Sequence, residues 1–195
     1  MCGIFAYLGP ARPDPDLLEA AATAAASRGP HGHGWATSAS TTRHEFGPLP
    51  PAAVRDLTDR AVIGHARLAT TGDYRDRTGL QPVAAGGHWL AHNGTVRNWR
   101  TLTPDAASDS VALAELYAHH RRQLDGPHAL RAALADADTA AWALLVLDVD
   151  GSLVVWRRGL PLWQHRHPTG LYLASRRFHP DAAPVPEDTI CQEHP

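Results

Sequence analysis

The sequence begins Met1-Cys2-Gly3-Ile4-Phe5-Ala6-Tyr7-Leu8-Gly9 and continues with Pro10. Residues 2–8 form an apolar run that ends at Gly9-Pro10, a pattern typical of a buried strand. Removal of Met1 would give Cys2 a free α-amino group, which has a pKa of about 8. The thiol is intrinsically very nucleophilic, so a single residue would carry both a nucleophile and a base. The alternative is that Cys2 is simply a small buried residue of this strand.

The composition favours one globular domain over residues 1–195, since this length suffices for a sizeable core. The chain has 18 basic residues, all arginine, and 20 acidic ones, giving a formal charge of −2. No basic cluster points to nucleic acid, and no apolar run reaches membrane-spanning length. We find no leader sequence, which makes a cytoplasmic protein the default expectation.

Cofactor and metal signatures are also missing from the sequence. The two cysteines, Cys2 and Cys191, lie at opposite ends and form neither a disulfide framework nor a metal motif. The 13 histidines include close pairs, but no complete ligand set can be recognised. No glycine-rich phosphate loop is present, so no nucleotide cofactor is implied. We therefore expect neither a cofactor nor a metal.

The order of elements favours a mixed fold. Helical spacing predicts a helix over residues 14–27, another beginning near Ser108 or Asp109, and a third over residues 128–135. Residues 38–60 are predicted to be a connection, residues 70–87 a long loop, and residues 179–195 a proline-rich tail. Strands are predicted over residues 2–8, 35–37, 61–68, 88–92, 141–149, 152–157 and 170–175, with a hairpin turn at Asp150-Gly151. One compact unit of helices and mostly antiparallel strands belongs to the α+β class.

Arg67 lies near the end of the strand predicted over residues 61–68, in Gly64-His65-Ala66-Arg67. An arginine on a buried strand requires a partner, because burying an unpaired charge is costly. A substrate carboxylate would serve, bound through two parallel hydrogen bonds. An internal salt bridge is the alternative.

Asn93 and Gly94 follow the short strand predicted over residues 88–92. Acyl transfer requires donors aimed at the developing oxyanion, commonly a side-chain amide and a backbone N–H. Asn93 and Gly94 can supply one of each. The same dipeptide is also the signature of an ordinary turn.

Two further charged residues complete the candidate site. Asp109 could bind the ammonium group of an amino-acid substrate, or it could simply cap its helix. Arg28 stands in the tight turn Ser27-Arg28-Gly29-Pro30 and could fix the backbone near the first strand, unless this is only a glycine-rich connection. A nucleophile, a carboxylate receptor, an oxyanion pair and an ammonium receptor together match attack on the side-chain amide of an α-amino acid. Glutamine is the obvious candidate.

These segments, in this order, resemble the class II glutamine amidotransferases, whose glutaminase domain is an N-terminal-nucleophile (Ntn) hydrolase. The resemblance runs from Cys2 to about Ser175. It rests on seven segments: Met1-Cys2-Gly3-Ile4-Phe5, Arg28-Gly29-Pro30, Gly64-His65-Ala66-Arg67 with Ala69-Thr70, Gln81-Pro82, His92-Asn93-Gly94, Ser108-Asp109-Ser110 and Arg158-Gly159-Leu160-Pro161-Leu162.

The resemblance implies a four-layer αββα sandwich of mostly antiparallel sheets, of the Ntn-hydrolase type. It implies that Cys2 attacks the glutamine amide and that Asn93 and Gly94 hold the oxyanion. Arg67 would bind the α-carboxylate and Asp109 the α-ammonium group. The matched motifs add Arg28, Thr70 and His92 to the expected substrate-binding residues.

The resemblance also suggests what consumes the product. Most members of this family carry a second domain that uses the ammonia, and this sequence ends at Pro195. We therefore expect ammonia to pass to a separate synthase subunit. Two alternatives stay open: an amidase acting on a γ-glutamyl or related small-molecule amide, and a catalytically silent binding module. Leu68 and Thr71 differ from residues common in the family, which keeps the amidase alternative open.

Overall fold

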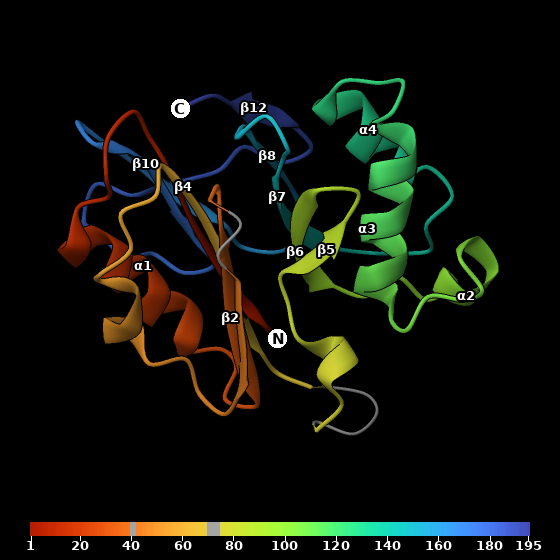
Figure 1. Ribbon diagram of the computed structural model, residues 1–195, viewed down its shortest axis with the longest axis horizontal. Coiled ribbons are helices and arrows are strands. Elements are labelled where there is room, and N and C mark those ends of the chain that lie inside the picture. The colour runs from red at the N-terminus through yellow and green to blue at the C-terminus, as the bar shows by residue number, and fades with distance from the viewer. Residues whose placement is uncertain (40–41, 70–74) are drawn as a thin grey trace.

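Two antiparallel sheets lie face to face at the centre of the computed structural model, which describes residues 1–39, 42–69 and 75–195 (Figure 1). The first sheet has the order β11-β9-β10-β1-β4-β2-β3, and the second has the order β12-β8-β7-β6-β5. The strands of the first sheet are β1 (Gly3–Leu8), β2 (Gly32–Thr37), β3 (Thr42–Phe46), β4 (Ala61–Arg67), β9 (Trp163–His167), β10 (Gly170–Ala174) and β11 (Ala183–Pro184). Those of the second are β5 (Val83–Ala85), β6 (His88–Gly94), β7 (Trp142–Leu147), β8 (Leu153–Arg158) and β12 (Cys191–Glu193).

Helices cover the outer face of each sheet. On the first sheet lies α1 (Pro15–Ala26), with the short 3₁₀ turn η1 (Pro51–Val54) beside it. On the second lie α3 (Asp109–His120) and α4 (Gly126–Ala133), as Figure 1 shows. The remaining turns are η2 (Arg77–Gly79) and the four-residue α2 (Trp99–Leu102). The layers therefore run helix, sheet, sheet, helix, which confirms the predicted α+β sandwich.

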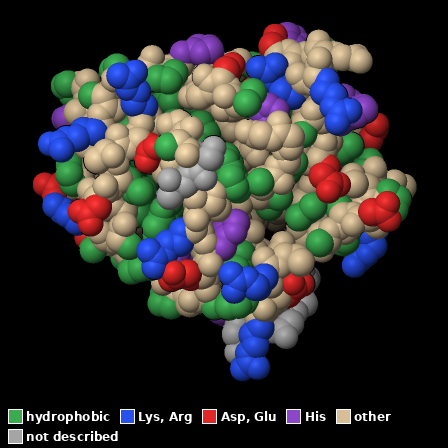
Figure 2. Space-filling view, in the orientation of Figure 1, with side chains coloured by type: hydrophobic (Ala, Val, Ile, Leu, Met, Phe, Trp, Pro, Cys, Tyr) green, Lys and Arg blue, Asp and Glu red, His purple; other side chains and the backbone are tan. Residues whose placement is uncertain are grey.

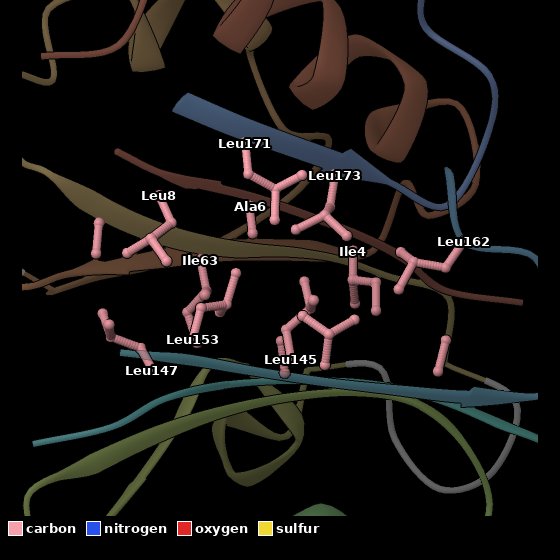
Figure 3. Close-up of a cluster of buried hydrophobic side chains, with 14 of the residues drawn as sticks. Ile4, Ala6, Leu8, Ile63, Leu145, Leu147, Leu153, Leu162, Leu171 and Leu173 are labelled. Carbon is pink, nitrogen blue, oxygen red and sulfur yellow. The ribbon is translucent and has the colours of Figure 1, made fainter. Parts of the chain in front are cut away.

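Alternation along β1 explains how the sandwich is filled. Ile4, Ala6 and Leu8 point into the layer between the sheets, whereas Phe5 and Tyr7 point toward α1. Figure 3 shows the inter-sheet layer, where leucine, isoleucine and alanine side chains from both sheets meet. All six residues of β1 are buried because both of its faces are covered.

All three predicted helices are present, although α4 begins and ends two residues before the predicted range 128–135. The helix predicted over residues 14–27 is α1, and the Asp14 carboxylate caps it by accepting hydrogen bonds from Asp16 N and Leu17 N. The helix expected near Ser108 or Asp109 is α3. Ser108 is its N-cap, with Oγ accepting from Val111 N.

Several segments differ from the prediction. The predicted loop 70–87 contains β5, and β9 was not predicted. Part of the stretch predicted as a connection forms β3, an edge strand whose polar residues are mostly exposed. The strand predicted over residues 88–92 continues to Gly94, since Asn93 and Gly94 still pair with Ala143 and Trp142 on β7. The proline-rich tail contains β11 and β12, which add to the edges of both sheets, where strand proline is tolerated.

The molecular surface carries charges of both signs. Basic and acidic side chains are interspersed over the face shown in Figure 2. Within residues 1–39, 42–69 and 75–195, no helix is long and apolar enough to cross a lipid bilayer.

Candidate active site

A cleft of about 580 Å³ opens where β1 begins and β6 ends. Its lining includes Cys2, Arg67, His92, Gly94 and Asp109. These five residues come from four separate regions of the sequence and were all predicted site residues. The cleft has the size and mixed polarity of a small-molecule site.

The Cys2 thiol lies against the end of β4. Its Sγ is 3.3 Å from Leu68 N, which donates to it, and 3.6 Å from Leu68 O. Burial raises the pKa of the thiol above its usual value. The Leu68 backbone, the terminal ammonium of Met1 and the Arg67 guanidinium partly offset this effect. Cys2 is therefore within electrostatic reach of both the chain terminus and Arg67.

Arg28 holds the backbone of Cys2. Its Nε donates to Cys2 O at 2.7 Å, and Gly29 beside it is packed closely against the main chain of Ala66 and Arg67. Arg28 does not contribute to the cleft lining formed by the described residues. Its geometry is that of a residue that positions Cys2.

Arg67 is the last residue of β4. Side chains alternate between the two faces of a strand, so Arg67 points to the same inter-sheet face as Ile63, four residues earlier. The residue is 9% exposed. Nη1 donates to Asp76 O at 3.0 Å, so a main-chain carbonyl holds the guanidinium at the cleft wall. The pairing of Gly3 with Ala66 brings this end of β4 beside Cys2.

Asp109 occupies the first turn of α3. The N-cap of this helix, which was the alternative role for Asp109, is Ser108. One carboxylate oxygen accepts from Val96 N at 3.1 Å, and the other accepts from Ser110 N at 2.8 Å. The charge lies close enough to Cys2 to raise the pKa of the thiol, although its effect there is smaller than that of burial. The carboxylate is thus fixed on the cleft wall.

Asn93 and Gly94 end β6. Asn93 shares the inter-sheet face with Ala91, and unlike Gly94 it is not among the described residues that line the cleft. Asn93 is 2% exposed, and its Nδ2 has no hydrogen-bond partner among the described residues. A buried amide donor without a partner is uncommon and calls for an explanation. Gly94 has φ +156°, and a Cβ there would lie 2.5 Å from His92 Nε2.

His92 points to the opposite face of β6, toward α3. Its Nδ1 lies 3.1 Å from Ser110 Oγ, and its backbone N donates to Gln81 Oε1 at 2.7 Å. Burial lowers the pKa of the imidazole, against a smaller opposing effect of Asp109. A neutral His92 therefore packs at the floor of the cleft.

Two residues that form this site were missing from the predicted set. Gln81 Nε2 donates to Ser110 Oγ at 3.0 Å, so its side chain joins β6 to α3. Both Gln81 and Ser110 line the cleft. The Gln81-Pro82 motif could have identified Gln81. Its side chain, however, bonds to residues far away in the sequence, so the motif alone does not place it at the cleft. Thr70, predicted to bind substrate, lies outside the described residues.

No group of three or more histidine, cysteine, aspartate or glutamate residues in the described part of the chain could hold a metal ion. No protein-family model and no curated protein sequence matches the chain. Solved structures do match it.

One similar structure is the glutamine phosphoribosylpyrophosphate (PRPP) amidotransferase of B. subtilis, with 22% identity and a TM-score of 0.69. The match covers 89% of this chain and 42% of that enzyme. This chain therefore spans about two fifths of the enzyme's length.

Two further structures match along almost their whole length. A glutamine aminotransferase class-II domain protein from Silicibacter pomeroyi is 14% identical, with a TM-score of 0.60 and 99% of each chain covered. A predicted glutamine amidotransferase from Pseudomonas aeruginosa is 13% identical, with a TM-score of 0.63, covering 98% of this chain and 96% of that one. The chain described here has the fold of the class II glutamine amidotransferases.

Proposed function

We propose that this protein hydrolyses the side-chain amide of glutamine to glutamate and ammonia, with Cys2 as the nucleophile. One observation carries the proposal: the thiol of Cys2, the guanidinium of Arg67 and the carboxylate of Asp109 line a single cleft and interact electrostatically. A thiol flanked by a cation and an anion suits an amino-acid substrate that carries both charges and a reactive side chain.

The proposed binding mode uses each charge once. Arg67 pairs with the α-carboxylate, since a guanidinium binds carboxylate through two parallel hydrogen bonds. Asp109 accepts hydrogen bonds from the α-ammonium group. The side-chain amide then extends toward Cys2. The two charged anchors convert attack by the thiol into an effectively intramolecular step.

The proposed reaction requires removal of Met1, whose side chain is exposed. The freed α-amine of Cys2 takes the thiol proton as sulfur attacks the amide carbon, and the oxyanion is stabilised by Asn93 Nδ2 and Gly94 N–H. The amine returns that proton to the leaving nitrogen, which departs as ammonia and leaves a γ-glutamyl thioester. Water then cleaves the thioester, giving glutamate and restoring the thiol.

The unpartnered Nδ2 of Asn93 supports this assignment. A donor that is already buried and fixed requires little reorganisation energy when negative charge develops on the substrate. Neutral His92 behind it adds no competing charge. Arg28, through its bond to Cys2 O, keeps the nucleophile at the cleft.

A separate synthase subunit is the proposed recipient of the ammonia. The second candidate function is an amidase that cleaves γ-glutamyl or related amides. Trp99 and Arg100 also line the cleft, and its volume exceeds what a molecule as small as glutamine requires. Comparing turnover of glutamine with that of larger γ-glutamyl amides distinguishes the two candidates.

Replacement of the nucleophile tests the proposal. We expect the purified chain to lack Met1 by intact mass, to release ammonia from L-glutamine, and to be labelled at Cys2 by an electrophilic glutamine analogue. Cys2→Ala should abolish turnover and labelling while leaving the fold unchanged, because it removes only the sulfur. Cys191→Ala, which alters a half-buried thiol on the edge strand β12, is the matched control and should retain full activity.

Retention of Met1 in an active preparation would contradict the proposed base. Turnover by Cys2→Ala would contradict the nucleophile. Hydrolysis of γ-glutamyl amides without any hydrolysis of glutamine would favour the second candidate.

A further inference from the structure

The guanidinium of Arg67 lies directly on the main chain of Gly79. A Cβ built on Gly79 would lie 2.4 Å from Arg67 Nη2, 2.5 Å from Cζ and 2.8 Å from Nε. Contact with three atoms of the planar group shows that the guanidinium rests against the glycine along much of its length. Only a residue without a side chain permits this approach.

The turn that carries Gly79 is fixed on both sides. Asp76 caps it through a hydrogen bond from Thr78 N to Oδ1 at 2.9 Å, while Asp76 O accepts from Arg67 Nη1 at 3.0 Å. After the turn, the Gln81 side chain bonds to His92 N and Ser110 Oγ. Residues 76–81, which we name the clamp segment, therefore join Arg67 to the strand of Asn93 and the helix of Asp109.

We propose that Gly79 is a specificity-determining residue: by letting Arg67 lie flat on the clamp segment, it sets where the substrate carboxylate binds relative to Cys2. This inference rests on the proposed function. The distance between carboxylate receptor and thiol decides which amino-acid side chain places its amide at the sulfur. A fixed guanidinium thereby selects glutamine over asparagine, which is one methylene shorter.

Gly79→Ala tests the contact between Gly79 and the Arg67 guanidinium. Gly79 does not have a positive φ, so alanine fits its backbone conformation. The atoms that an added methyl would meet belong to the end of a flexible side chain. We expect the guanidinium to move while the fold and its stability are kept. Arg77→Ala, an exposed position on the same turn, is the matched control.

Binding is measured by calorimetry in the Cys2→Ala background, which prevents turnover. Gly79→Ala should weaken L-glutamine binding at least about tenfold, a loss of about 1.4 kcal/mol. Binding of 4-aminobutanamide, which is glutamine without its carboxyl group, should change less than about twofold. In the Cys2-containing enzyme the same substitution should raise the KM for L-glutamine more than it lowers kcat, and should reduce discrimination against L-asparagine.

Unchanged L-glutamine binding by Gly79→Ala, or equal weakening of both ligands, would overturn the inference. Failure of the parent chain to bind L-glutamine would instead contradict the proposed function. The inference would then fall with it. If L-glutamine binds, the crystal structure of Gly79→Ala checks the premise: a displaced Arg67 guanidinium supports the inference, and an unmoved one overturns it.

Discussion

At the scale of single residues, His65 has the most unusual environment among the described histidines. It is fully buried on β4, on the same inter-sheet face as Arg67, and neither ring nitrogen has a hydrogen-bond partner among the residues that the structure describes. Burial lowers the pKa of its imidazole to about 3, with further contributions from His92, Arg67 and His44. His65 is therefore neutral at pH 7, and it adds no positive charge beside Arg67.

This histidine should make the fold sensitive to acid. Its pKa is about 3 when folded and about 6.5 when unfolded, so between these values the unfolded chain binds one more proton. Above pH 6.5 His65 is neutral in both states. As the pH falls below this value, the free energy of unfolding decreases by up to about 1.4 kcal/mol per pH unit. His65→Leu should reduce the slope of unfolding free energy against pH by about that amount between pH 6 and 4. Urea unfolding at several pH values measures it.

The exposed His194→Leu provides the control for that experiment and should leave the slope unchanged. Equal slopes for the parent and His65→Leu would show that folding does not lower the pKa of His65.

At the scale of elements, a buried carboxylate adds to the contacts between α3 and the second sheet. Asp148 follows β7 and has a side chain with 0% exposure. It accepts hydrogen bonds from Tyr117 Oη at 2.9 Å and from Arg121 Nε at 2.7 Å, and both donors lie on or next to α3. His88 Nδ1 lies 2.7 Å from Asp148 Oδ1. Burial alone would raise the pKa of Asp148, but these three partners outweigh it and hold the pKa below its usual value.

Asp148→Asn should therefore lower the free energy of unfolding by about 3–5 kcal/mol at pH 7, since it removes one partner of a buried ionic network. A depressed pKa stabilises the fold above about pH 3.8 and ceases to do so as the pH falls through the folded value. The difference between parent and variant should thus shrink below pH 4. Chemical denaturation at pH 7 and pH 3 checks both statements.

Asp150→Asn is the matched control, because Asp150 is 43% exposed and lies 3.5 Å from the same arginine. It should cost no more than about 1 kcal/mol. A similar cost for both variants would argue against a special role for Asp148.

At the scale of the whole molecule, the layer between the sheets sets the spacing of the candidate site. Arg67 belongs to the first sheet and Cys2 directly precedes its strand β1, whereas Asn93 and Gly94 belong to the second sheet. No sequence-local contact fixes the distance between these two groups. The side chains in Figure 3 do so by filling the space between β1, β4 and β7.

Leu145→Ala tests the importance of this layer. Leu145 is fully buried on β7, where it pairs with Ala91 of β6. The substitution should cost about 2–5 kcal/mol, from lost burial and from the cavity that remains. Denaturant unfolding measures this cost, and Val149→Ala, at a 68% exposed position, should cost less than about 0.5 kcal/mol. Equal effects of the two substitutions would contradict the packing described here.

Much of the fold could be predicted because its signals are local. The apolar run of β1, the cap of α1 and the hairpin at Gly151, which has φ +81°, depend on neighbouring residues. Edge strands were missed for the opposite reason. β3 and β12 are polar or contain little apolar pattern, and they form only because a partner strand offers unpaired backbone groups.

The sequence by itself determined the chemical types available to the candidate site: a thiol next to the terminus, an arginine on a buried strand, an Asn-Gly pair and an aspartate at a helix start. Only the tertiary structure decided which of them meet. Strand pairing brought Arg67 beside Cys2, and sheet packing placed Asn93 on the facing strand. The contacts of Gly79 with Arg67 and of Gln81 with Ser110 bridge separate segments. Such contacts leave no periodic signal in the sequence, because their geometry exists only after the two sheets have packed.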